Sequence, residues 1–139
     1  MMKKFIFPLF YLFTSLLATT INIPSDYTTI QEGINASVDG DTVLIAQGTY
    51  YENLILEKEI ALASHAINDD LGSDWLDNVN IQETVISGAQ EASDPNKGSC
   101  LVIRDGNIQP TIIGLTFQDG LGTSMQRNNC GLIQKERSG

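Results

Sequence analysis

Residues 28–53, TTIQEGINASVDGDTVLIAQGTYYEN, decide the fold, because this short stretch combines a helix start, a turn and a buried strand. Thr28 or Thr29 can cap a helix, and the glutamine or glutamate three residues later can bond back to the cap amide in a capping box. Ile30 and Ile34 share one face of that helix. The pattern predicts a short helix that lies on an apolar surface.

A strand follows this helix after the turn Asp39-Gly40-Asp41. Val43 and Ile45 point to one side of the strand and Leu44 points to the other, because side chains alternate along a strand. We therefore expect a cap helix around Ile30 to Asn35, laid over the first strand of a stack.

The later chain consists of short apolar segments that are rich in β-branched residues and separated by turn residues, as stacked parallel strands require. These segments are 43–46, 54–56, 60–63, 84–86, 101–103 and 111–117. No long amphipathic helix follows any of them, which argues against a βαβ fold. Alternation predicts a core of Ile30, Ile34, Val43, Ile45, Leu54, Leu101, Ile103, Ile112, Leu115 and Phe117.

Three motifs carry a family resemblance. QGTYYEN at 47–53 resembles the amino-terminal cap and first coil of right-handed parallel β-helix proteins of the pectin lyase-like superfamily, nearest to pectin methylesterases and related secreted β-helix repeat proteins. TVISG at 84–88 and GLTFQDG at 114–120 resemble two later strands. The likeness spans about Ile23 to Gly122. It implies an all-β fold, a right-handed parallel β-helix (solenoid) with a short amino-terminal cap helix, and it identifies a scaffold better than a reaction.

The first 20 residues have the three parts of a secretory signal peptide: Lys3 and Lys4, an apolar core, and the small residues Ala18-Thr19-Thr20. A retained membrane anchor is the weaker interpretation, because the apolar run is short for a bilayer and Pro8 interrupts it. We expect cleavage near Ala18 to Thr20, no membrane insertion after leader removal, and a protein that is secreted or at the cell surface, in the periplasm or outside the cell.

Removal of the leader takes away two lysines and no acid, so the formal charge changes from −9 to −11. A field of that sign repels nucleic acid and gives no attraction to an anionic polysaccharide. Residues 21–139 suffice for only four or five β-helix coils. No cap helix is recognisable from Met125 to Gly139, so we expect the truncated amino-terminal coils of a longer β-helix, with further coils missing.

The resemblance to pectin methylesterases implies an aspartate nucleophile, a second aspartate and oxyanion-holding glutamines. Gln126 is the one positional match for such a glutamine, and an ordinary turn glutamine is the alternative. The family's catalytic aspartates and arginine have no counterpart here. We therefore predict no catalytic residue in this chain.

Two ligand sites are candidates in the polar segment that follows Ala63. Asp69, Asp70, Asp74 and Asp77 offer carboxylate oxygens at the short spacing that suits calcium, and a solvated acidic loop is the alternative. Trp75 could stack on a sugar face or fold back and pin its own loop. Calcium is the only cofactor that the sequence suggests.

Cys100 and Cys130 could form a disulfide in an oxidising compartment, or each could be a small buried apolar residue. The expected fold is compatible with three functions. The first is a noncatalytic β-helix that binds a polysaccharide or cell-surface glycan along its flank. The second is the front of a pectin esterase or lyase whose catalytic residues lie beyond the chain end, and the third is a structural stalk. We favour the first for the chain as given.

Overall fold

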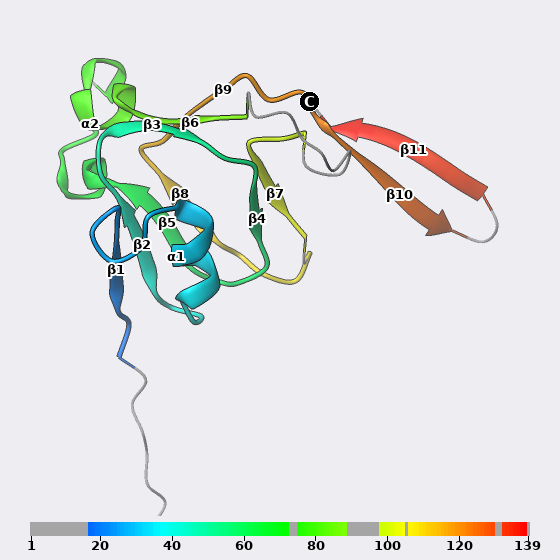
Figure 1. Cartoon of the computed structure of the whole chain (residues 1–139), viewed down its shortest axis with the longest axis horizontal. Helices are drawn as coiled ribbons and strands as arrows, with labels where there is room; N and C mark the ends of the chain where they lie inside the picture. Colours follow the sequence, from blue (N-terminus) through cyan, green and yellow to red (C-terminus); the bar gives the residue numbers. More distant parts are fainter. Residues whose placement is uncertain (1–16, 73–74, 89–97, 105, 130–131, 139) are drawn as a thin grey trace, which may run out of the picture.

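The computed structural model shown in Figure 1 describes residues 17–72, 75–88, 98–104, 106–129 and 132–138, with side-chain positions up to residue 122. Most of the predicted leader lies outside these residues. The elements, in chain order, are β1 (Thr20–Ile23), α1 (Ile30–Ala36), β2 (Thr42–Ile45), β3 (Gly48–Tyr51), β4 (Leu54–Leu56), β5 (Ala61–Ser64), η1 (His65–Asn68), η2 (Trp75–Asp77), α2 (Val79–Gln82), β6 (Thr84–Ser87), β7 (Leu101–Ile103), β8 (Thr111–Ile113), β9 (Thr116–Gln118), β10 (Thr123–Asn129) and β11 (Leu132–Ser138).

Nine of these strands form three parallel sheets, in the orders β1-β2-β5-β8, β3-β6-β9 and β4-β7. Strands β2, β3 and β4 enter three different sheets, and β5, β6 and β7 return to the same three sheets in the same order. The register repeats as well, since Val43 lies opposite Leu62, and Leu62 lies opposite Ile112. The prediction of an all-β chain with parallel strand pairing is confirmed.

Helix α1 begins with the predicted capping box. The Thr29 hydroxyl accepts a hydrogen bond from the amide of Glu32 at 3.2 Å, and the Glu32 carboxylate accepts one from the amide of Thr29 at 3.1 Å. Gly33 faces the sheet, where an added Cβ would lie 2.8 Å from Cδ1 of Ile23. The glycine that weakens the helix by itself therefore lets the helix approach β1 closely.

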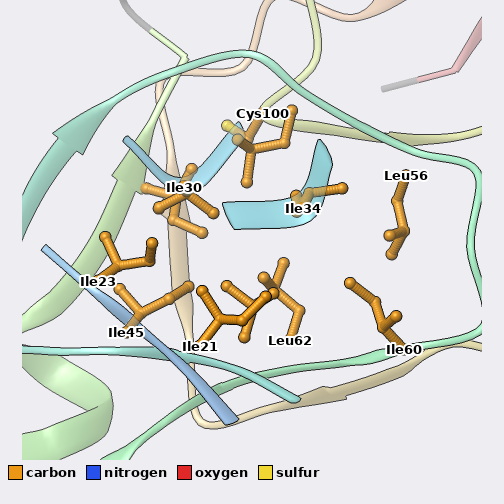
Figure 2. Close-up of a cluster of buried hydrophobic side chains, with 12 residues drawn as sticks. Ile21, Ile23, Ile30, Ile34, Ile45, Leu56, Ile60, Leu62 and Cys100 are labelled. Carbon is orange, nitrogen blue, oxygen red and sulfur yellow. The ribbon is translucent and has the colours of Figure 1, made fainter. Parts of the chain in front are cut away.

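The core lies between α1 and the sheets, and Figure 2 shows Ile30 and Ile34 of the helix gathered with Ile23 and Ile45. Five of the predicted core residues are buried, namely Ile30, Ile34, Val43, Ile45 and Leu54. Leu101 and Leu115 are half-buried against the same cluster. The helix and the first strands therefore form the apolar interior that the alternation predicts.

Three predicted core residues are exposed, and the prediction that they are buried is wrong. Ile103, Ile112 and Phe117 are 44%, 36% and 41% exposed. Their register partners Leu56, Leu62 and Ile86 are completely buried. The three exposed side chains thus continue the buried rows, but β7, β8 and β9 are the last strands of their sheets, so no described strand covers them. We call the surface formed by Ile103, Ile112 and Phe117 the open end.

The carboxy-terminal strands β10 and β11 pair with each other in antiparallel register, from Thr123 opposite Ser138 to Asn129 opposite Leu132. No strand is predicted in this segment from the sequence pattern. In Figure 1 the hairpin extends away from the parallel sheets. It differs from every other described strand pair, all of which are parallel.

Candidate functional site

A groove of about 330 Å³ lies between α1 and the sheet of β4 and β7. We call it the flank groove. It is lined mainly by amide and charged side chains: Gln31, Ile34, Asn35, Asn53, Ile55, Glu57, Lys58 and Arg104.

Helix α1 forms one wall of the flank groove, and Glu52 fixes its amino-terminal end. The two carboxylate oxygens of Glu52 accept hydrogen bonds from the amides of Ile30 and Gln31, at 2.9 and 3.0 Å. The first amides of a helix have no partner within the helix, and a carboxylate there also faces the positive end of the helix dipole. Glu52 therefore anchors the helix start from the loop between β3 and β4.

Gln31 joins the middle of the wall to strand β4. Its amide oxygen accepts a hydrogen bond from the amide of Ile55 at 2.8 Å, and its amide nitrogen donates to the Ile55 carbonyl at 3.1 Å. The same nitrogen donates to Oδ1 of Asn35 at 3.0 Å. The side chain thus bonds to both backbone groups of one β4 residue and orients Asn35.

Lys58 holds the other end of the wall. Its ammonium group donates to the carbonyls of Ile34, Asn35 and Ser37 at 2.8, 2.7 and 2.5 Å. The last carbonyls of a helix have no partner within the helix, and a cation is favoured at that end. The flank groove therefore has a wall fixed at three points.

Several polar groups in the groove remain available to a ligand. Asn53 donates through its amide nitrogen to the carbonyl of Ser99 at 3.1 Å, and its amide oxygen has no hydrogen bond to a described residue. The amide nitrogen of Asn35 likewise has none. Arg104 lies 3.8 Å from Glu57, with both side chains about half exposed, so this pair contributes little stability. A guanidinium group with unused donors thus faces solvent at the groove.

The groove also differs in charge from the rest of the molecule. Between residues 17 and 122, among the side chains that the structure describes, the lysines and arginines are Lys58 and Arg104, and both line the groove. Acidic residues are spread over the other elements. An anionic group would therefore meet repulsion over most of this surface and least repulsion in the flank groove.

Trp75 lies in η2 at a second pocket, of about 400 Å³, formed largely by Leu71, Ile81 and the apolar residues around Gly114. Its side chain is 53% exposed. The ring thus has an apolar wall on one side and solvent on the other. This arrangement is compatible with stacking on a ligand and with pinning of the loop, so its binding role stays a prediction.

The predicted calcium ligands lie in different surroundings. Asp69 accepts hydrogen bonds through Oδ2 from the amide groups of Asn78 and Asn80, at 2.9 and 2.8 Å, and these bonds hold the pKa of its carboxyl below the ordinary value. Asp70 accepts one from the backbone of Gly72, and Asp74 lies outside the described residues.

Asp77 is part of η2. No group of three or more metal-ligating side chains occurs among the described residues. Calcium binding stays a prediction, which the melting temperature at millimolar calcium tests.

Two further predictions concern residues near the carboxy terminus. Gln126 lies in β10, where no side chain is described, and Cys130 lies outside the described residues. Cys100 is buried, and its sulfur donates a hydrogen bond to the carbonyl of Gln118 at 3.0 Å. The disulfide and the role of Gln126 both stay predictions.

A third pocket, of about 540 Å³, contains one carboxylate. Asp119 has a positive φ of 57°, which is uncommon for a residue other than glycine, and it accepts a hydrogen bond from the Ser87 hydroxyl at 3.0 Å. The described residues that line this pocket include no second acidic side chain. Acid–base catalysis by paired carboxylates needs two such groups.

A comparison of the chain with protein-family models, curated proteins and solved structures finds no match. Within the described residues, no helix has the length and apolar character required to span a membrane. The flank groove could not be predicted from the sequence, because its lining comes from α1, from residues in and beside β4, and from Arg104 after β7. These residues form no recognisable motif along the chain.

Proposed function

We propose that this chain is a secreted, noncatalytic domain with a right-handed parallel β-helix fold, and that it binds a glycan of a polysaccharide or cell surface along its flank. The ordered return of the strands to three parallel sheets supports the β-helix. The leader pattern supports export. The resemblance of residues 47–53 and 114–120 to secreted β-helix proteins agrees with both.

The flank groove is the observation that carries the binding function. Sugars present hydroxyl groups that both donate and accept hydrogen bonds, and the groove offers an amide oxygen on Asn53, an amide nitrogen on Asn35 and the guanidinium of Arg104. Ile34 and Ile55 add apolar surface for the faces of a sugar ring. Because α1 is held at three points, binding orders little additional chain, and this lowers its entropic cost.

Arg104 favours a ligand with a carboxylate, since a guanidinium can donate two parallel hydrogen bonds to one. The low density of cations elsewhere on the described surface keeps such a ligand at the groove. An acidic sugar unit within an otherwise neutral glycan therefore suits the site better than a densely charged polyanion, which the net charge repels.

Binding measured by calorimetry with neutral and uronate-containing oligosaccharides tests this proposal. Arg104→Ala should weaken binding of the acidic ligand more than that of the neutral one, and Asn53→Ala should weaken both. Gln109→Ala is the matched control, because it removes an exposed amide outside the groove. Unchanged affinities in both groove variants would overturn the proposed site.

The alternative function is the amino-terminal part of an extracellular pectin esterase or lyase whose catalytic residues lie beyond the chain end. The same family resemblance favours it. We expect the chain to be inactive on methyl-esterified pectin and on polygalacturonate, since the pocket at Asp119 offers a single carboxylate among its described residues. Turnover that disappears in Asp119→Asn would establish the enzyme and exclude the noncatalytic function.

A further inference from the structure

Among the described residues, Thr19 is the first that the fold holds through both backbone groups. Its amide donates to Oδ1 of Asp41 at 2.7 Å, and its carbonyl accepts a hydrogen bond from the amide of Thr42 at 2.9 Å. Leu17 and Ala18 are exposed, and among the described residues the one hydrogen bond that involves them is a 3.5 Å contact from the Thr19 hydroxyl to the Leu17 carbonyl. Within the described residues, backbone hydrogen bonding to the parallel sheets therefore starts at Thr19.

The acceptor of the Thr19 amide is a buried carboxylate. Asp41 is 5% exposed, and its other oxygen accepts a hydrogen bond from the amide of Val38 at 2.8 Å. These two hydrogen bonds, with a smaller contribution from the charge of Lys58, hold the pKa of Asp41 below its ordinary value. Asp41 is thus a buried anion that faces the nitrogen of Thr19, and a buried anion is stabilised most by a cation.

The leader pattern leaves three places for cleavage, after Ala18, after Thr19 or after Thr20. Loss of Thr19 would leave Oδ1 of Asp41 and the amide of Thr42 without these partners, and an unpaired buried polar group costs stability. Cleavage after Ala18 keeps both hydrogen bonds. Ala18 is also the residue in this set that best fits the small-residue pattern at a signal-peptide cleavage site.

We propose that the leader is removed between Ala18 and Thr19, and that the new α-ammonium group of Thr19 forms an ion pair with Asp41. A signal peptidase catalyses the addition of water across this amide, which leaves a carboxylate on Ala18 and an amine on Thr19 that takes up a proton. The neutral N–H···O bond becomes a charge-assisted one, which is about twice as strong. This inference rests on the export in the proposed function.

The site of cleavage is tested with the full chain, expressed with its own leader in a bacterial host. Intact mass and amino-terminal sequencing of the exported protein should show a chain that starts at Thr19. A start at Thr20 or Ile21 would overturn this inference and leave export standing. An intact leader on protein that stays in the cell would overturn this inference and export together. Glycan binding is measured in a separate experiment. Its result tests the flank groove independently of the cleavage site and of export.

The ion pair is tested by the rate at which an amine-specific reagent modifies the α-amino group of the exported protein near pH 7. The reagent attacks the neutral amine, so a carboxylate that raises the amine pKa by one unit slows the reaction about tenfold. Asp41→Asn should restore the faster rate. Asp39→Asn is the control, because the Asp39 carboxylate bonds to the amide of Glu59. Equal modification rates in the wild type and in Asp41→Asn would overturn the ion pair. The cleavage site determined by intact mass does not depend on either variant.

Discussion

The open end should make the protein self-associate at high concentration, and its exposed side chains set the magnitude. Complete burial of an isoleucine or phenylalanine side chain contributes about 1.5–3 kcal/mol. Ile103, Ile112 and Phe117 are 44%, 36% and 41% exposed, so covering them contributes about 2–4 kcal/mol per copy. The unpaired edges of β7, β8 and β9 add backbone groups that can bond to another strand.

Two such surfaces together contribute about 4–8 kcal/mol, against an association cost of about 4–15 kcal/mol. The expected result is a weak complex that forms as the concentration rises and not a stable dimer. The most favourable balance is about −4 kcal/mol, which corresponds to a Kd of about 1 mM. Sedimentation velocity over a concentration series from about 10 μM to 1 mM therefore reaches the concentration at which this complex begins to form.

The double variant Ile112→Lys/Phe117→Lys should stay monomeric over the same range, because charge at the open end opposes its burial. Val38→Lys is the control: Val38 is 48% exposed and lies outside the open end. Association that persists in the double variant, or a wild type that is monomeric at every concentration, would refute the argument that the uncovered rows drive association.

Four further predictions concern stability, each measured by urea unfolding. Lys58→Met should lower the free energy of unfolding by about 2 kcal/mol, because three carbonyls at the end of α1 lose a charged donor. Ile86→Ala should cost about 2–5 kcal/mol and Phe117→Ala clearly less, although the two residues are register partners, because only Ile86 is buried. Equal losses of unfolding free energy in these two variants would contradict the placement of Phe117 at an uncovered end. Thr84→Val should raise the free energy of unfolding by about 1 kcal/mol, since the buried Thr84 hydroxyl has no partner among the described residues. Asp41 has a lowered pKa when folded, so its contribution is complete above its ordinary pKa of about 3.9 and is lost as the pH falls through the lower folded value; Asp41→Asn should flatten this acid limb.

Features set by neighbouring residues could be predicted from the sequence. The capping box of Thr29 and Glu32 spans three residues, and the alternation of Val43 and Ile45 spans two. Both depend on local geometry that any helix start or strand shares. The sequence therefore predicted the helix, the strand and the side of the strand that is buried.

Burial at the open end could not be predicted in the same way. Alternation correctly places Ile112 and Phe117 on the inward side, because each lies opposite a buried register partner. Whether that side is covered depends on the next layer of the stack, and no local pattern reports it. The hairpin of β10 and β11 was missed for a related reason, since it pairs within itself and does not continue the parallel rows.

The candidate site depends on residue types that are visible in the sequence and on the stacking of distant segments, which is not. Gln31, Glu52 and Lys58 read as ordinary polar surface residues in the sequence, but stacking places each of them at an unpaired backbone group of α1 or β4. The fold thus uses these side chains fully, and a substitution there should affect stability before binding. Asn53 and Arg104 lie at the same groove with donors or acceptors that no described residue uses. Arg104 can change with little loss of stability, because its exposed pair with Glu57 contributes little. A change at Asn53 removes one hydrogen bond, to the Ser99 carbonyl, and leaves the ends of α1 held. Ligand selectivity should therefore depend on this second pair.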